Sequence, residues 1–327
     1  MSAVPRHQVT PKLGYGGQAV LEGVMMRGRR YMAVAVRAPD KSIVLHAQAL
    51  PARIYSGAIS RIPVLRGLTM LWDSLVLGMS ALTFSANIAM REVPAEGATG
   101  EPEKPESSNS MQAATWGSIA LALVFGIGLF FVLPLAVVGL FERAVEPSFW
   151  SHLVEGLVRL VLLVGYVWLI GLTPDIRRVY QYHGAEHMTI HAFEHDTPLT
   201  PQAIEQYPTA HPRCGTAFLL LVLVVSILVL AVVGTPDLIT RVLSRIVLIP
   251  VIAGIAYEIL RFGGNHYEKS FLVRLIVAPG LLLQAITTKR PELDMIEVAI
   301  AAFQEVRQRE ETAHQAHVAP VSPQPLA

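Results

Sequence analysis

The residues best suited to chemistry lie in one short segment, Tyr182–His195, where histidines and glutamates recur at helical spacing. His183-x-x-Glu186-His187 has the spacing of the inverted zinc-protease motif. Two histidines four residues apart lie on one face of a helix and can hold one metal ion, and the neighbouring glutamate can act as base on a water molecule at that ion. The segment therefore predicts a metal site with His183 and His187 as ligands and Glu186 as the catalytic base.

Helix geometry requires further ligands from outside this segment. His191 lies roughly 12 Å along the helix axis from His183, at about 1.5 Å per residue, so one ion cannot take all three histidines of a straight helix. Either one pair recruits an outside ligand or there are two sites. The outside candidates are His211, Cys214 and Glu258. Imidazole with thiolate favours zinc as the divalent ion.

Each candidate also has an ordinary structural explanation. Histidines keep an amphipathic helix beside a membrane soluble, and Cys214 suits a small packed position where a span begins. The glycine-rich segment 16–28 fits a strand with glycine turns, or it brings Glu22 and Arg27 to the histidines. Glu258, near a membrane boundary, fits a structural ion pair or a snorkelling side chain.

The elements that position these residues are expected to be membrane helices. Hydrophobic residues make up 52% of the chain and charged residues only 16%, whereas soluble domains carry about 25%. A helical span needs about 20 apolar residues. Four blocks meet this requirement: Ser107–Phe141, Leu153–Thr173, Cys214–Pro236 and Leu238–Phe262. The shorter run Leu275–Thr288 suits an interfacial or re-entrant piece.

The remaining segments predict a mostly α membrane protein with about four transmembrane helices, an interfacial helix and a small N-terminal β-region. Strand-like runs on either side of the turn Ala38–Ser42 indicate the β-region. The predicted division is 11–61, a β-rich cytoplasmic region; 62–90, an interfacial or partly inserted helix; 91–112, a disordered acidic linker; 113–290, the transmembrane domain with a cytoplasmic histidine-rich loop at 174–213; and 291–327, a C-terminal helix and tail.

Charge asymmetry predicts the orientation. The histidine-rich side carries most of the basic residues close to the spans: Arg177, Arg178, Arg213, Arg261 and Lys269. The opposite side has only Arg143 and Arg241 in its short loops. The positive-inside rule then places the histidine-rich side and both termini in the cytoplasm. The N-terminus lacks the apolar core of a secretory signal, and a single cysteine excludes an intramolecular disulfide.

Five ordered motifs resemble one known family. They are Gly-Gly-Gln-Ala-Val-Leu-Glu-Gly-Val-Met-Met-Arg-Gly from Gly16, Tyr-His-Gly-Ala-Glu-His from Tyr182, His-Pro-Arg-Cys-Gly-Thr from His211, Ala-Tyr-Glu-Ile-Leu-Arg from Ala256, and Pro-Gly-Leu from Pro279 followed by Gln-Ala-Ile-Thr-Thr. The chain resembles the YqhQ-like bacterial multi-pass membrane proteins, a domain of unknown function, over roughly 14–303. The resemblance implies a bacterial inner-membrane location and a metal dependence that is itself a prediction. Met188 stands where such sequences often carry a basic residue.

These observations favour a metal-dependent membrane enzyme with its site on the cytoplasmic face. Among reaction classes they favour hydrolysis. The alternative is a non-enzymatic membrane scaffold or partner-binding protein. A transporter ranks third, because the clear spans lack the mid-membrane charge pairs of an ion path. The expected partners are the lipid bilayer and an unidentified substrate or protein. A net charge of +1 gives no indication of nucleic-acid binding.

Overall fold

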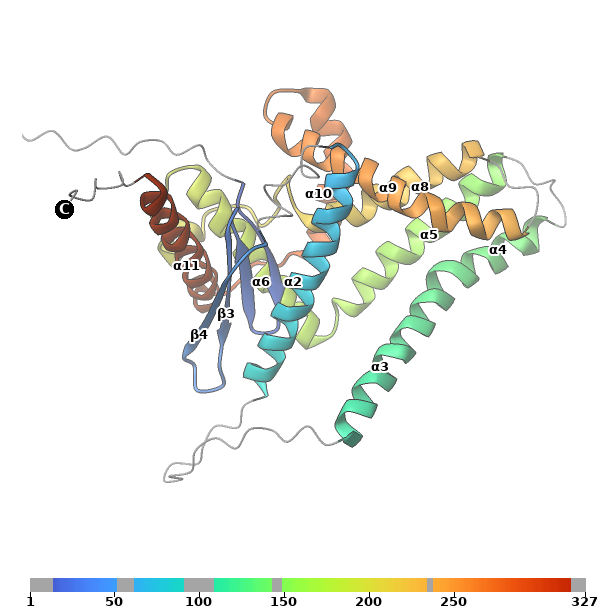
Figure 1. Cartoon of the computed structure of the whole chain (residues 1–327). Coiled ribbons are helices and arrows are strands. Elements are labelled where there is room, and N and C mark those ends of the chain that lie inside the picture. The colour runs from blue at the N-terminus through green and yellow to red at the C-terminus, as the bar shows by residue number, and fades with distance from the viewer. Residues whose placement is uncertain (1–13, 52–61, 91–108, 143–148, 234–237, 319–327) are drawn as a thin grey trace, which may run out of the picture.

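The computed structural model describes residues 14–51, 62–90, 109–142, 149–233 and 238–318. Its N-terminal part is an antiparallel sheet in the order β1-β2-β3-β4 (Figure 1). The strands are β1 (Gly16–Val20), β2 (Gly23–Arg27), β3 (Tyr31–Arg37) and β4 (Ile43–Ala49). The predicted small N-terminal β-region is confirmed, and the turn at residues 38–42 joins β3 to β4.

Helices cover both faces of this sheet. Val34 and Val36 of β3 join a core with Leu77 and Ala81 of α2 (Leu65–Ala89). The alternate residues of β3 face α6 (Pro174–Glu194) and α11 (Leu293–Val318) on the other side. Successive strand residues point to opposite faces, and the five central residues of β3, Met32–Val36, are apolar and buried because both faces are covered.

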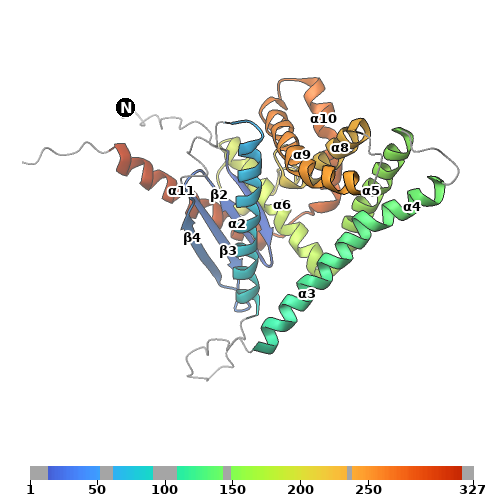
Figure 2. The same cartoon turned by 45° about the vertical axis from the view of Figure 1, so that its right-hand side comes forward.

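Most of the remaining helices form an apolar group beside the sheet (Figures 1 and 2). These helices are α3 (Asn109–Ile127), a π-helical turn (Gly128–Val132), α4 (Leu133–Glu142), α5 (Phe149–Ile170), α8 (Gly215–Val233), α9 (Leu238–His266) and α10 (Phe271–Thr287). The short helix α7 (Pro201–Ile204) lies between α6 and α8 in the chain. Helix α8 contacts α5, α9 and α10, so it is central to this group.

Three helices of the described chain are long and apolar enough to cross a membrane: Leu65–Ala89, Leu153–Ile170 and Val247–His266. Shorter apolar helices occupy Ala120–Phe130, Gly215–Leu230 and Phe271–Thr287. These helices indicate membrane association. The expected number of four spans remains a prediction, because the first of the three is α2, which was expected at the interface, and two expected spans appear among the shorter helices.

The predicted linker 91–112 leads into the first apolar block. Residues 91–108 of the predicted linker lie outside the described residues. The last four residues assigned to it, 109–112, belong to the first turn of α3.

Candidate metal centre

Helix α6 carries the histidine motif and is fixed at its start by local sequence. Thr173 precedes it in an extended conformation, Pro174 takes the first helical turn and Asp175 adds a negative charge there. These are typical features of a helix N-terminus. From Gly184 to Ile190 every residue of α6 is buried, because β1 and β2 pack along the helix and α11 packs beside it.

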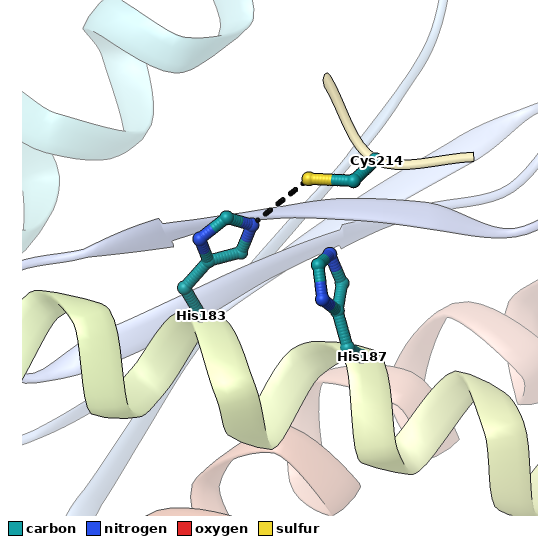
Figure 3. A group of neighbouring side chains, drawn as sticks. All are labelled: His183, His187 and Cys214. Carbon is teal, nitrogen blue, oxygen red and sulfur yellow. Dashed lines mark hydrogen bonds between the residues drawn. The ribbon is translucent and has the colours of Figure 1, made fainter. Parts of the chain in front are cut away.

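Two histidines of α6 converge with the chain's cysteine. Nε2 of His183 lies 3.2 Å from Sγ of Cys214, and the rings of His183 and His187 are 4.4 Å apart between centroids. Figure 3 shows both rings projecting from α6 toward the sulfur. One ligand atom from each of the three residues lies within 4.8 Å of the others, so this group, here called the cage, could hold a metal ion.

Backbone carbonyls fix which ring nitrogens face the cage. Nδ1 of His183 lies 2.9 Å from the carbonyl oxygen of Thr287, and Nδ1 of His187 lies 2.6 Å from that of Thr209. A carbonyl oxygen only accepts, so each Nδ1 carries the proton and each Nε2 keeps its lone pair. This is the outer-shell arrangement usual for metal-ligating histidines. Burial lowers the pKa of His187, which favours the neutral form that binds metal.

A glycine lets the segment that follows α10 approach α6 closely. A Cβ on Gly184 would lie 2.2 Å from the carbonyl oxygen of Lys289. The backbone N–H of Lys289 also donates to the carbonyl of Tyr180 at 2.9 Å. The chain after α10 therefore rests directly on the α6 backbone, two residues beyond the Thr287 carbonyl that accepts the proton of His183.

The cysteine ligand lies directly before α8. The thiol of Cys214 is 5% exposed, and the backbone N–H of Thr216 points at its sulfur at 3.4 Å. The first turn of a helix favours negative charge. The position thus suits a thiolate ligand.

Glu186 lies beside the cage and is almost completely enclosed, with 3% exposure. Its Oε2 is 3.4 Å from Nε2 of His187, and the backbone N–H of Gly17 donates to its carboxylate. A Cβ on Gly17 would lie 2.8 Å from Oε1, so β1 contributes a bare backbone here. Burial raises the pKa of Glu186, while His183, His211 and the Gly17 N–H act in the opposite direction.

A second group of three lies next along α6. One ligand atom from each of His191, Glu194 and His211 falls within 4.8 Å of the others. Nε2 of His191 donates to the carbonyl of Ala210 at 2.8 Å, and burial lowers the pKa of His191 to about 4. Arg213 forms an ion pair with Glu194. The pair His183 and His187 thus lies with the outside residue Cys214, while His191 lies in a separate group.

Glu194 was not among the predicted site residues. The spacing His191-x-x-Glu194 repeats His183-x-x-Glu186, and this repeat would have identified it. The carbonyls of Thr209 and Thr287 could not be predicted from the sequence, because a residue of any type supplies a backbone carbonyl.

Three expected contributors lie elsewhere. Glu258 accepts two hydrogen bonds from Arg66, so it joins neither group and forms an ion pair with Arg66 of α2, not with the neighbouring Arg261. Glu22 accepts from Arg178 at 2.5 and 2.6 Å. Arg27 donates to Ser74 of α2. The glycine-rich segment serves the site through the backbone of Gly17 instead.

Comparison with known proteins identifies the family. The family described as "Protein of unknown function (DUF1385)" matches residues 62–309. The uncharacterized protein YqhQ of Bacillus subtilis (strain 168) is 34% identical over 311 residues, which cover 95% of this chain and 96% of that protein. No solved structure matches the chain. The match over most of both lengths shows that the chain belongs to the DUF1385 family of YqhQ-like proteins.

Proposed function

We propose that this protein is a metal-dependent enzyme of the bacterial inner membrane, most suitably a hydrolase. The observation that carries the proposal is the convergence of two Nε2 lone pairs on the sulfur of Cys214, with both Nδ1 protons given to backbone carbonyls. Structural histidines need no such agreement between ring orientation and a neighbouring thiol. Backbone carbonyls that accept the other ring proton are regular partners of metal-ligating histidines.

The donor set favours zinc. Two imidazoles and one thiolate are ligands found together in zinc sites, and three protein ligands leave a fourth tetrahedral position for water or substrate. When bound, such an ion polarises a carbonyl or phosphoryl oxygen and makes water a stronger acid.

Glu186 supplies the base. Its carboxylate reaches to within 3.4 Å of the Nε2 of His187, so a water molecule beside that nitrogen lies within its hydrogen-bonding range. The Gly17 N–H holds the carboxylate in place from β1. Glu186 thus accepts the proton of the attacking water and can return it to the leaving group.

The site lies where the apolar helices begin and end. Cys214 directly precedes α8, and Thr287, whose carbonyl orients His183, is the last residue of α10. The basic residues Arg177 and Arg213 flank the same region in the sequence. We place this boundary on the cytoplasmic side by the positive-inside rule.

Metal analysis of detergent-purified protein tests the proposal. Wild-type protein prepared without chelator is expected to carry zinc in stoichiometric amount, and His183→Ala and His187→Ala should lose it. Glu186→Gln should keep the ion and lose turnover on a panel of ester, amide and phosphoester substrates. His46→Ala is the matched control, because His46 of β4 packs against Phe84 of α2 on the opposite face of the sheet. It should change neither property.

Absence of the ion from wild-type protein, or its full retention by both histidine variants, would reject the metal site. The non-enzymatic scaffold would then be the better explanation of the motifs.

A further inference from the structure

The loop that carries Cys214 is held by more than its own turn. The backbone N–H of Cys214 donates to the carbonyl of His211 at 3.2 Å, closing the turn His211–Cys214. The N–H of Arg213 donates to Nδ1 of His211 at 3.2 Å. These local bonds shape the turn. His187 and His191 of α6 donate to the carbonyls of Thr209 and Ala210, which lie just before it.

One buried side chain of α10 holds the residue that begins the turn. Gln284 has 0% exposure. Its Oε1 accepts from the backbone N–H of His211 at 2.8 Å, and its Nε2 donates to the carbonyl of His211 at 3.0 Å. A single amide thus satisfies both backbone groups of the residue that begins the turn. Asparagine is one methylene shorter, and glutamate has no donor for the carbonyl.

Glu194 holds the same turn from α6. A backbone N–H can only donate, so Nδ1 of His211 is the unprotonated nitrogen and Nε2 carries the proton. That Nε2 faces Oε2 of Glu194 at 3.4 Å, while Arg213 pairs with Oε1. The second group is therefore satisfied internally. A cation there would meet the N–H of His211 and the charge of Arg213.

We infer that Gln284 and Glu194 are positioning residues that hold the His211–Cys214 turn so that the sulfur faces His183 and His187, and that the second group binds no ion of its own. The role of Cys214 as a ligand rests on the proposed function. The rigid seating of its thiol does not.

The chain's single cysteine makes thiol labelling a direct assay of that seating. Metal-free protein is prepared with chelator in detergent, and a maleimide reports the reaction of Cys214. Wild-type protein should label slowly. Gln284→Met, which keeps the volume but loses both hydrogen bonds, should label about tenfold faster, since opening of the turn then costs less. Leu283→Ala, at the neighbouring buried position of α10, is the matched control for general loosening and should label at nearly the wild-type rate.

Cobalt-substituted protein gives the metal-dependent readout. The sulfur-to-metal charge-transfer band of wild-type protein should weaken in Gln284→Met, with metal affinity lower by about 10- to 100-fold, as for other outer-shell changes. Glu194→Gln keeps an acceptor for His211 but loses the pair with Arg213 and should show smaller effects in the same direction. Glu194 is partly exposed, so this replacement disturbs folding less than the replacement of the buried Gln284. His191→Ala should leave one ion per chain.

The outcomes separate the two proposals. Wild-type protein without metal rejects the proposed function, and the labelling rates still decide the seating of Cys214. Equal labelling of wild-type protein, Gln284→Met and Glu194→Gln overturns the positioning role. Two ions per chain, reduced to one by His191→Ala, overturn the assignment of the second group.

Discussion

Replacement of Gly184 by alanine should damage the cage without touching a ligand. The new Cβ would lie 2.2 Å from the carbonyl oxygen of Lys289, so the segment must retreat by about 1.2 Å to reach the ordinary contact distance of 3.4 Å. Both partners are backbone, so no side chain can rotate away. The retreat would break the hydrogen bonds from Lys289 N–H to Tyr180 and from His183 Nδ1 to Thr287.

The opposing contributions give a net loss of stability. Alanine is favoured over glycine in a helix by about 1 kcal/mol. Overpacking costs about 2 kcal/mol, and the two hydrogen bonds contribute about 1 kcal/mol each. The expected change is a destabilisation of about 3 kcal/mol, and metal affinity should fall by about 10- to 100-fold because the imidazole of His183 loses its orienting partner.

A thermal melt of the purified protein, followed by metal titration, measures both effects. A loss of about 3 kcal/mol corresponds to a fall in Tm of roughly 6 to 12 °C in a domain of 150–250 residues. Gly165→Ala is the matched control, because Gly165 is a helical glycine of α5 with no atom within 4 Å of its added Cβ. If Gly184→Ala melts and binds metal as Gly165→Ala does, the close approach is not what orients His183.

Three further predictions concern other parts of the molecule. Glu258→Gln should lower the free energy of unfolding by about 1 kcal/mol, and Tm with it, because Arg66 loses its half-buried partner. The variant should retain the metal, and loss of the ion would restore Glu258 as a ligand. In a cysteine-free background, an impermeant reagent added to intact cells should label a cysteine at Ser148 but not one at Thr197, and the reverse pattern would invert the proposed topology. The metal-free protein should lose stability as pH falls from about 6.5 toward 4, because His191 stays neutral in the folded chain while the same residue takes up a proton in the unfolded chain. If Tm depends on pH in His191→Asn as it does in the wild-type protein, this reasoning is wrong.

The grouping of His183 with His187 was predictable because helix periodicity determines which histidines share a face. His183 and His187 were paired on that basis, and the rejection of His191 from the same ion agrees with its place in the second group. Glu258 was misjudged because its distance from α6 in space could not be derived from its position in the chain. Arg66, its actual partner, lies 192 residues away.

The sheet and the helical bulk of the chain were predictable from strand alternation and apolar runs, but the contacts between them were not. The segment 16–28 was expected to be a strand with glycine turns, but nothing in its sequence indicated that Gly17 lets the β1 backbone approach Glu186. The role of Gln284 depends on α10 ending beside α6, and no local pattern encodes such an approach. The sequence of α2 does not distinguish a membrane span from a helix that packs on the sheet, since the exposed face of the helix is as apolar as its buried face.

The place of α11 against β2 and β3 has a consequence for biosynthesis. The sheet ends at Ala49 and the helix that completes its cover starts at Leu293, so roughly 240 residues are synthesised between them. At about 5 to 20 residues per second, the apolar face awaits its partner for roughly 10 to 50 s, while the intervening helices are being inserted. Ribosomal stalling or premature termination before α11 would leave that face open to chaperones and proteases. Packing of α11 on the sheet can thus distinguish chains that contain this helix from shorter chains, which remain open to degradation.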